Sequence, residues 1–393
     1  MKEVFVVAAC RTAIGDFGGS LKTQTPADLG TAVLNSLWER AKIDPVQVQQ
    51  MFVGHVINTE PRDMYLSRVM ALQAGMPQSS VAMNVNRLCG SGLQAIISAA
   101  QTIKLGDADW AVGAGAESMS RAPYISTSHR WGVRMGDSVM QDMMTGALTD
   151  PFDRIHMGIT AENVAKKYSI SRADQDELAL LSHRRAAHAI EQGYFTDQIV
   201  PITMKSRKGE TRFDTDEHVR GDIDQAGLAA LRPVFQKEDG TVTAGNASGL
   251  NDGAGAVLLA SAEAVKAHGQ QALARLVSWG HAGVDPLHMG IGPVPAVRIA
   301  LKKAGLSIAD MDVIEANEAF AAQACAVSRE LQLDPAKVNP NGSGISLGHP
   351  IGATGAIITT KAIYELQRTQ GKYALVTMCI GGGQGIAAIF ERV

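Results

Sequence analysis

Hydrophobic positions in this chain follow two alternating patterns. One is a helical spacing, as in Leu34, Trp38 and Ala41, and the other is a short apolar run, as in Trp110 to Gly115 or Tyr373 to Met378, which is typical of a strand. The two patterns alternate in an early and in a late part of the chain. Such alternation favours an α/β fold in which helices cover both faces of a mostly parallel sheet.

The early and late parts repeat each other at a nearly constant displacement. The segment Leu34 to Met51 reappears in character as Val297 to Ile314, about 263 positions later. Further on, Gly90-Ser91-Gly92 and its apolar helix correspond to Gly352-Ala353-Thr354 and the helix that follows. A constant offset over so long a stretch indicates a duplicated unit. The expected fold class is therefore two related α/β halves with mixed, mostly parallel sheets.

The repeat sets the domain boundaries that we predict. Residues 1–118, completed by roughly 249–272, form the N-terminal half, and residues 273–393 form the C-terminal half. Residues 119–248 have no counterpart and form an inserted loop domain, which we expect to bind substrate and to support oligomerisation. Methionines of this insertion suit an adaptable apolar binding surface or the filling of an irregular core; they are Met119, Met135, Met140, Met143, Met144 and Met157.

Composition and charge exclude several other classes of protein. With 46% apolar residues and a net charge of −3 over 393 residues, the chain is unlike disordered and polyanion-binding proteins, so no nucleic acid or membrane partner is expected. No secretory signal and no run of about eighteen apolar residues is evident, so a cytoplasmic location is expected. Cys10, Cys89, Cys325 and Cys379 are then expected to be free thiols, and Cys10 and Cys325 to be inert packing residues.

The first candidate for chemistry is the turn from Asn86 to Gly92. The apolar stripe from Leu93 to Ile103 predicts a helix after it, so Cys89 would lie at a helix N-terminus. Free N–H groups and the positive end of the helix dipole favour a thiolate there, and we expect the pKa of Cys89 to be lowered. A small core residue is the other interpretation of a cysteine at such a turn.

The second candidate is the glycine-rich stretch from Asn341 to Ala356. By the repeat, Ile351 is the counterpart of Cys89, so His349 stands two residues from the equivalent position. If a pseudo-twofold axis relates the halves, the two helix starts face a common centre, and His349 could take a proton from Cys89. Without that geometry, a histidine before Pro350 is only a turn residue.

Two further loops follow predicted strands. Cys379 and the glycines 381–383 end the apolar run from Tyr373, where α/β proteins place ligands, and their N–H groups could hold an oxyanion. No helix follows these glycines, which argues against a dinucleotide-binding loop. Asn317 ends another strand and is predicted to cap a helix that Glu318 opens; capping and a role in a site explain it equally well.

Taken together, the four loops resemble the thiolase family, and the resemblance covers the whole chain. The matching segments are Asn86-Arg87-Leu88-Cys89-Gly90-Ser91-Gly92, Asn317-Glu318-Ala319-Phe320, Gly348-His349-Pro350 and Cys379-Ile380-Gly381-Gly382-Gly383. The chain looks most similar to bacterial biosynthetic ketothiolases of broad specificity, which supply polyhydroxyalkanoate precursors. The resemblance implies an acyl-CoA:acetyl-CoA C-acyltransferase that makes or cleaves 3-ketoacyl-CoA by ping-pong condensation or thiolysis, within fatty acid metabolism.

The resemblance also implies roles for the matching residues. Cys89 would be the nucleophile that carries the acyl group, His349 its base, and Cys379 the thiol that moves the α-proton of the second acyl-CoA. Asn317 would hold a water in one oxyanion hole with His349, and the N–H groups of Cys89 and Gly381 would form the other. The implied acyl, pantetheine and coenzyme A contacts are Leu148, His156, Met157, Arg220, Ala244, Ser248, Met289, Ala319 and Phe320.

The same resemblance implies the partners. These are acetyl-CoA, longer acyl-CoA and free coenzyme A, with no metal and no other cofactor, in a homotetramer. Acyl chain length and physiological direction stay open, because one site catalyses both condensation and thiolysis and a methylene in the pocket is worth only about 1–3 kcal/mol.

Other interpretations stay open as well. A decarboxylating ketoacyl synthase has a related fold, but it usually pairs one cysteine with two histidines, and Cys379 stands where the second histidine is wanted. A zinc protein could use Cys89, His349 and Cys379 as ligands, although no closely spaced Cys or His pair supports it. A non-catalytic lipid-carrier or scaffold relative would not need both thiols and the histidine.

Overall fold

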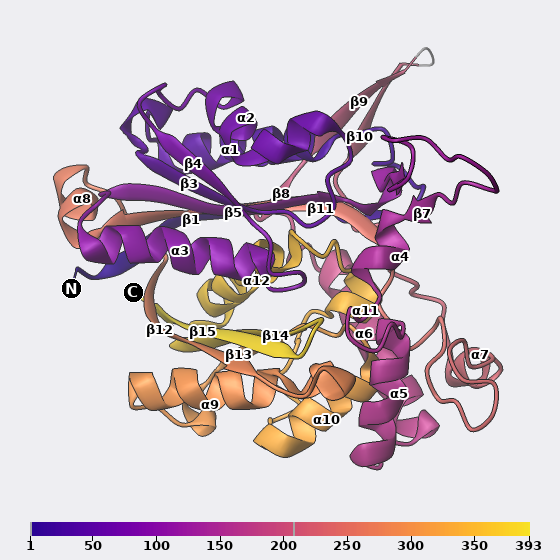
Figure 1. Cartoon of the computed structure of the whole chain (residues 1–393). Helices are drawn as coiled ribbons and strands as arrows, with labels where there is room; N and C mark the ends of the chain where they lie inside the picture. The colour runs from indigo at the N-terminus through magenta and orange to yellow at the C-terminus, as the bar shows by residue number, and fades with distance from the viewer. Residues whose placement is uncertain (1, 207–208) are drawn as a thin grey trace.

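The computed structural model describes residues 2–206 and 209–393. Figure 1 shows a layered molecule in which two parts of a sheet enclose a central pair of helices and further helices cover the outer faces. The strands of the first part are β1 (Val4–Thr12), β3 (Gln50–Gly54), β4 (Val81–Val85), β5 (Trp110–Ser118) and β11 (Asn251–Ser261). Those of the second are β12 (Ala274–Gly283), β13 (Val313–Ala316), β14 (Tyr373–Ile380) and β15 (Gln384–Arg392).

The strand order reveals the duplication. The main strands join in the order β13-β14-β15-β12-β1-β11-β5-β3-β4, so that β1 and β12 meet at the junction of the two parts. Outward from this junction, β1-β11-β5-β3 is matched by β12-β15-β14-β13. The predicted α/β halves, related by a repeat, are therefore visible in the sheet itself.

The pairing directions refine the expected sheet. β3 pairs in parallel with β4 and β5, and β13 pairs in parallel with β14. The strands nearer the junction pair antiparallel, including β1 with β11 and β14 with β15. The mixed α/β fold is confirmed: along the main strand order the parallel pairs lie at the outer ends, and the short strand Ile199–Val200 also pairs in parallel with β1. β14 and β15 are joined by the tight turn at residues 381–383, which allows only an antiparallel pair.

Helices form the remaining layers. α1 (Pro26–Ala41) and α2 (Leu66–Gln73) cover the outer face of the first part, and α9 (Pro293–Ala304) and α10 (Ala321–Leu331) that of the second. Between the two parts lie α3 (Ser91–Leu105) and α12 (Thr354–Thr369) (Figure 1). Leu93 and Ile96 of α3 share one buried cluster with Ile358 and Ile363 of α12 and with strand residues of both parts.

The two central helices touch at their N-terminal ends. A Cβ placed on Gly92 would lie 2.7 Å from the backbone nitrogen of Ala356, and one on Gly355 would collide with the backbone nitrogen of Leu93. Only glycine permits such an approach of two backbones. The helix starts of both halves are thereby brought to a common centre, as the repeat predicted.

The segment between β5 and β11 packs against both parts: Phe195 and Ile199 belong to a buried cluster of the first part, and Val164 and Ile170 to one of the second. It contains α4 (Met143–Ala147), α5 (Met157–Lys167), α6 (Arg172–Glu191) and α7 (Gln225–Ala229), with the hairpin β9 (Ile202–Ser206) and β10 (Gly209–Phe213).

Shorter elements of the whole chain are β2 (Gly15–Asp16), β6 (Tyr124–Ile125), β7 (Gln141–Asp142), β8 (Ile199–Val200), α8 (Ala262–Ala267) and α11 (Gly344–Leu347). The 3₁₀ segments are η1 (Pro45–Gln47), η2 (Pro61–Tyr65), η3 (Met119–Arg121), η4 (Pro286–Ile291) and η5 (Ile308–Asp310).

One buried ion pair joins this segment to the first strand. The Arg11 guanidinium bonds both oxygens of Asp216, at 2.7 and 2.9 Å, and neither side chain is exposed. Among the described residues, none of the helices is both long enough and apolar enough to cross a membrane.

Candidate active site

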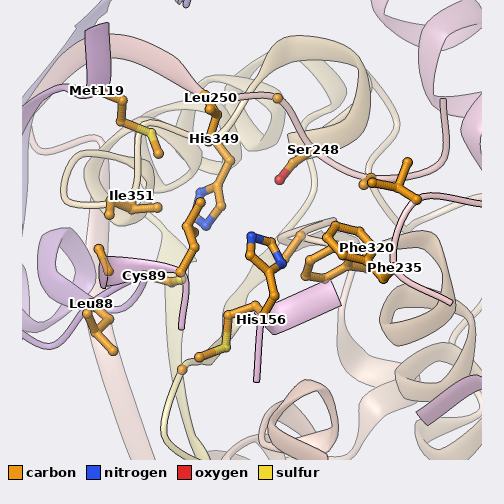
Figure 2. Close-up of a pocket in the computed structure, with 18 of the residues that line it drawn as sticks. Leu88, Cys89, Met119, His156, Phe235, Ser248, Leu250, Phe320, His349 and Ile351 are labelled. Carbon is orange, nitrogen blue, oxygen red and sulfur yellow. The ribbon is translucent and has the colours of Figure 1, made fainter. Parts of the chain in front are cut away.

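A cavity of about 370 Å³ opens where the two halves meet the inserted segment. Figure 2 shows Cys89 and His349 in its wall, with Met119 and Ile351 beside them and Phe235 and Phe320 farther to the right. Most of the predicted site residues line it: Cys89, Leu148, His156, Met157, Ala244, Ser248, Met289, Ala319, Phe320, His349 and Gly381. Of the other predicted residues, Asn317 and Cys379 lie just behind the wall and Arg220 lies elsewhere.

Cys89 lies two residues before the first residue of α3, on a turn that its own neighbours hold. Leu88 adopts a left-handed backbone conformation with φ of 45°. The N–H of Leu88 donates to Asn86 Oδ1 (3.1 Å), and the N–H of Arg87 donates to Ser91 Oγ (2.8 Å). This turn presents the half-buried Cys89 thiol to the cavity at the N-terminal end of the helix.

The resting thiol of Cys89 is less acidic than predicted. Burial raises its pKa to about 11, although the backbone N–H groups of Gly381 and of Cys89 itself lower it through hydrogen bonds. The negative charge of Glu117 raises it further. The expected lowering by the helix end is therefore wrong for the empty site, because the loss of water around the thiolate outweighs the helix end. Cys89 needs a base to become a nucleophile.

His349 follows α11 and is held at both its backbone and its ring. Its N–H donates to Asn251 Oδ1 (2.9 Å), and its ring Nδ1 lies 2.6 Å from Thr354 Oγ1. The preceding Gly348 has φ of 109°, and a Cβ there would lie 2.5 Å from the Asn251 side chain. Burial lowers the pKa of His349 to about 4, so the ring is neutral at pH 7 and can accept a proton.

The side chain of Asn317 lies beside the ring of His349, and Asn317 does not cap a helix. α10 begins only at Ala321 with Phe320 at the N-cap, so the predicted capping role is wrong. The backbone of Asn317 continues the sheet edge by donating to Thr377 O (3.0 Å). Its side-chain Nδ2 lies 3.4 Å from Nε2 of His349, while its buried Oδ1 has no hydrogen-bond partner. A buried amide oxygen that has no partner is suited to accept a hydrogen bond from a water beside the ring of His349.

Cys379 lies near the end of β14 and is fully buried. Its side chain packs with Met157, Met289 and Ala319, all of which line the cavity. Burial raises its pKa, and a negative charge on Cys89 would raise it further, so the two thiols are electrostatic neighbours. The first and last of the four predicted loops therefore converge, although the second thiol stands behind the cavity wall.

The opposite wall is apolar and aromatic. His156 stacks on Phe235 with ring centroids 4.7 Å apart, and Phe235 meets Phe320 edge to face at 6.4 Å. The N–H of Ser248 donates to Ala319 O (3.0 Å), which ties the end of the inserted segment to the loop after Asn317. These walls suit the apolar stem of an acyl or pantetheine chain.

Arg220 is the predicted contact residue that the structure does not bring to the cavity. It is exposed, and its backbone N–H donates to His183 Nδ1 (3.1 Å). The methionines of the insertion also differ in whether they reach the cavity. Met119 and Met157 line the cavity and are buried, whereas Met135 is 91% exposed.

Sequence reasoning missed several lining residues. Phe235, Leu250 and Ile351 all face the cavity, and all three lie outside any helix or strand. No periodic pattern marks such positions. The turn-rich run Thr243 to Leu250 before the long apolar strand β11 was the available signal, because loops that lead into a buried strand end at the edge of the sheet.

Comparison with known proteins agrees with this geometry. Residues 4–263 match the N-terminal domain of thiolases, and residues 270–392 match the C-terminal domain of thiolases. These two matches cover the two related halves, whose helix starts carry a thiol and a histidine at the cavity. The chain belongs to the thiolase family and is an enzyme of that family.

Individual relatives are similar over their full length. The chain is 67% identical over 392 residues to beta-ketothiolase BktB of Cupriavidus necator, covering 100% of both chains. It superposes on the acetyl-CoA acetyltransferase of Bacillus anthracis with a TM-score of 0.98, at 48% identity, covering 100% of this chain and 99% of the other. The human mitochondrial 3-ketoacyl-CoA thiolase in complex with CoA gives a TM-score of 0.97, at 46% identity, covering 100% and 98%.

These findings do not favour the other interpretations. The matches are to thiolases and acetyl-CoA acetyltransferases, and no second histidine stands at Cys379 as in a ketoacyl synthase. Within residues 2–206 and 209–393, no three His, Cys, Asp or Glu side chains are grouped as a metal site.

Proposed function

We propose that this protein is an acyl-CoA:acetyl-CoA C-acyltransferase, a beta-ketothiolase that makes or cleaves 3-ketoacyl-CoA through an acyl-Cys89 intermediate. One observation carries the proposal. The Cys89 thiol, the N–H groups of Cys89 and Gly381, and the neutral ring of His349 meet at a single apolar cavity, with Cys379 directly behind it. A nucleophile, a base and oxyanion donors are the parts that thioester exchange requires.

In the first half-reaction, the Cys89 proton passes to His349 while the sulfur attacks the thioester carbonyl. Because burial holds the thiol neutral with a pKa of about 11 and the imidazole neutral with a pKa of about 4, transfer accompanies attack. The N–H groups of Cys89 and Gly381 stabilise the developing oxyanion. The imidazolium then returns the proton to the leaving coenzyme A thiolate, leaving acylated Cys89 and free coenzyme A.

In the second half-reaction, Cys379 is the base for the α-carbon of the incoming acyl-CoA. The Cys379 proton passes to His349, and the resulting thiolate removes the α-proton. The carbanion attacks the acyl group on Cys89, and the carbon–sulfur bond breaks to release the Cys89 thiolate, to which the imidazolium of His349 returns the proton. The enolate oxygen would be stabilised by the ring of His349 and a water held by Asn317. Thiolysis is the reverse sequence.

The partners we propose are acetyl-CoA, longer acyl-CoA and free coenzyme A. Support comes from the relative solved in complex with CoA and from the apolar cavity walls. The steps above use thiols, an imidazole and backbone donors, so we propose that no metal or organic cofactor takes part. Supply of polyhydroxyalkanoate precursors fits the similarity to the beta-ketothiolase of Cupriavidus necator.

Labelling with radioactive acetyl-CoA tests the division of roles between the thiols. Cys89→Ser should give no labelled enzyme, whereas Cys379→Ser should be labelled on the peptide that contains Cys89 but should not condense. Denaturation and peptide mapping measure both outcomes. Label on another peptide, or equal loss in both variants, would reject the assignment.

A coupled assay tests the reaction class. Adding free coenzyme A to 3-ketoacyl-CoA should consume the ketoacyl absorbance without release of carbon dioxide. Carbon dioxide release from a malonyl thioester would point to a decarboxylating ketoacyl synthase instead.

We also propose a homotetramer located in the cytoplasm. Large apolar side chains are exposed on the segment 123–140, with Trp131 at 90%, and on the outermost strand β4, with Val81 at 57%. An open strand edge and exposed apolar surface usually mark an interface. Light scattering measures the mass in solution, and a monomer would overturn the proposed assembly.

A further inference from the structure

The hydroxyl of Thr354, the first residue of α12, lies between the ring of His349 and a backbone carbonyl. Thr354 Oγ1 is 2.6 Å from His349 Nδ1 and 3.0 Å from the carbonyl oxygen of Pro350. All three residues are buried, and Thr354 is 2% exposed. The Thr354 side chain does not cap the helix, because Ala353 holds the N-cap position and no side chain bonds the free N–H groups.

The direction of the bond to the ring follows from the bond to Pro350 O, in which the Thr354 hydroxyl is the donor. A carbonyl oxygen can only accept, and a threonine hydroxyl has a single proton to give. When that proton goes to Pro350 O, Thr354 Oγ1 must accept from the ring, so Nδ1 of His349 carries the hydrogen. The lone pair of the neutral ring is then on Nε2.

We infer that Thr354 is a positioning residue that selects the tautomer of His349 and thereby makes Nε2 the atom that receives the proton of Cys89. This inference rests on the proposed function, in which His349 is the base. Neutrality of the ring is what makes the tautomer decisive, since an imidazolium has hydrogens on both nitrogens.

The other polar neighbour of the ring does not select a tautomer. The amide nitrogen of Asn317 lies 3.5 Å from Nδ1 and 3.4 Å from Nε2, nearly equidistant and outside the usual hydrogen-bond range. Asn251 holds the backbone N–H of His349 and leaves the ring nitrogens untouched. Among the described polar partners of the ring, the Thr354 hydroxyl is the one that distinguishes the two nitrogens.

The chemical consequence is that the proton of Cys89 travels through Nε2 to the leaving coenzyme A. The Cys89 S–H bond breaks as Nε2 gains the hydrogen and sulfur bonds the acyl carbon, and the same hydrogen leaves Nε2 for the departing coenzyme A sulfur. Nδ1 keeps its hydrogen throughout, and its bond to Thr354 strengthens while the ring is positively charged. With the other tautomer, Nε2 would have no lone pair to offer.

Paired substitutions on α12 test the inference. Thr354→Val keeps the shape and removes the hydroxyl, and we expect acylation by acetyl-CoA, measured as kcat/KM, to fall by about 10- to 100-fold. Thr354→Ser keeps the hydroxyl and should stay close to the parent. Thr359→Val is the matched control, because Thr359 is buried on the same helix and donates to Gly355 O (2.7 Å) without touching the ring. It should acylate at the parent rate.

The second readout is the ring itself. In protein with ¹⁵N-labelled histidine, the resonances of His349, identified by their absence in His349→Asn, should show hydrogen on Nδ1 in the parent and in Thr354→Ser. A mixture of tautomers should appear in Thr354→Val. A parent ring with hydrogen on Nε2, or a Thr354→Val variant with parent tautomer and parent acylation rate, would overturn the inference.

Two different results distinguish a failure of the proposed mechanism from a failure of the role of Thr354. If His349→Asn acylates as fast as the parent, His349 is not the base, and the proposed mechanism falls whatever Thr354 does. If His349→Asn loses acylation but Thr354→Val and Thr359→Val behave alike, only the role of Thr354 is lost.

Discussion

The loops before α3 and α12 occupy equivalent places in the two halves, yet different parts of the chain hold them. The first loop, which carries Cys89, is fixed by its own members, with Arg87 bonded to Ser91 (2.8 Å). The second, which carries His349, is fixed from the other half: Asn251 accepts from the N–H of His349 and Glu117 accepts from the N–H of Gly352, each at 2.9 Å. The proposed nucleophile is thus positioned locally, whereas the proposed base is positioned only once both halves have come together.

The largest expected effect concerns the pKa of the Cys89 thiol on the first loop. Because burial raises the pKa of Cys89 to about 11, its thiolate fraction at pH 7 is lower than that of a free cysteine, and alkylation by iodoacetamide should rise about tenfold per pH unit up to about pH 10. Mass spectrometry of the Cys89 peptide measures the rate, and Cys89→Ser identifies the signal. A plateau between pH 7 and 9 would mean that the helix end dominates after all.

The second prediction concerns a substitution that removes a hydrogen bond holding the second loop. Asn251→Ala deletes the acceptor for His349 and opens space beside Gly348, so we expect kcat for thiolysis to fall by about 10²-fold through misplacement of the base. The pKa of the Cys89 thiol should be unaffected, since the first loop does not depend on Asn251. Steady-state kinetics and the same alkylation profile check both statements, and an unchanged kcat would contradict the first.

The third prediction tests the contact between the helix starts. Gly355→Ala places a methyl group against the backbone of Leu93, so the free energy of unfolding should fall by about 1–3 kcal/mol. Gly221→Ala is the control, because a Cβ there meets only Ala187 Cβ at an ordinary 3.6 Å. Denaturant unfolding measures both variants, and equal stability would show that the helices can separate at little cost.

The smallest effect is expected at Arg220. Its side chain is exposed and does not line the cavity, so Arg220→Ala should raise the KM for coenzyme A only a few-fold, in a salt-dependent way, and leave kcat unchanged. A large fall in kcat would show that this residue reaches the reacting groups in the complex.

The difference between the loops also explains what could be predicted from sequence. The repeat identified Cys89 and His349 as neighbours because two helix starts of a duplicated unit must face each other. Asn251 and Glu117 could not be found in this way, because each bonds a loop roughly one hundred or more positions away and belongs to a strand whose pattern indicates only burial. The prediction of a lowered pKa for Cys89 was wrong for a similar reason. A helix start can be recognised in the sequence, whereas the exclusion of water from the thiol cannot.

Strand β11 has a consequence for how the protein is made. It lies between β1 and β5, pairing Cys10 with Ala256 and Gly113 with Val257, so the first half lacks its middle strand until the whole insertion has been synthesised. A nascent chain must emerge beyond Ser261 before this core can close. Until then, the backbone groups of β1 and β5 that pair with β11 have no partner strand. Slowing translation after Ser118 should therefore lengthen dependence on chaperones, whereas slowing it after Ser261 should not.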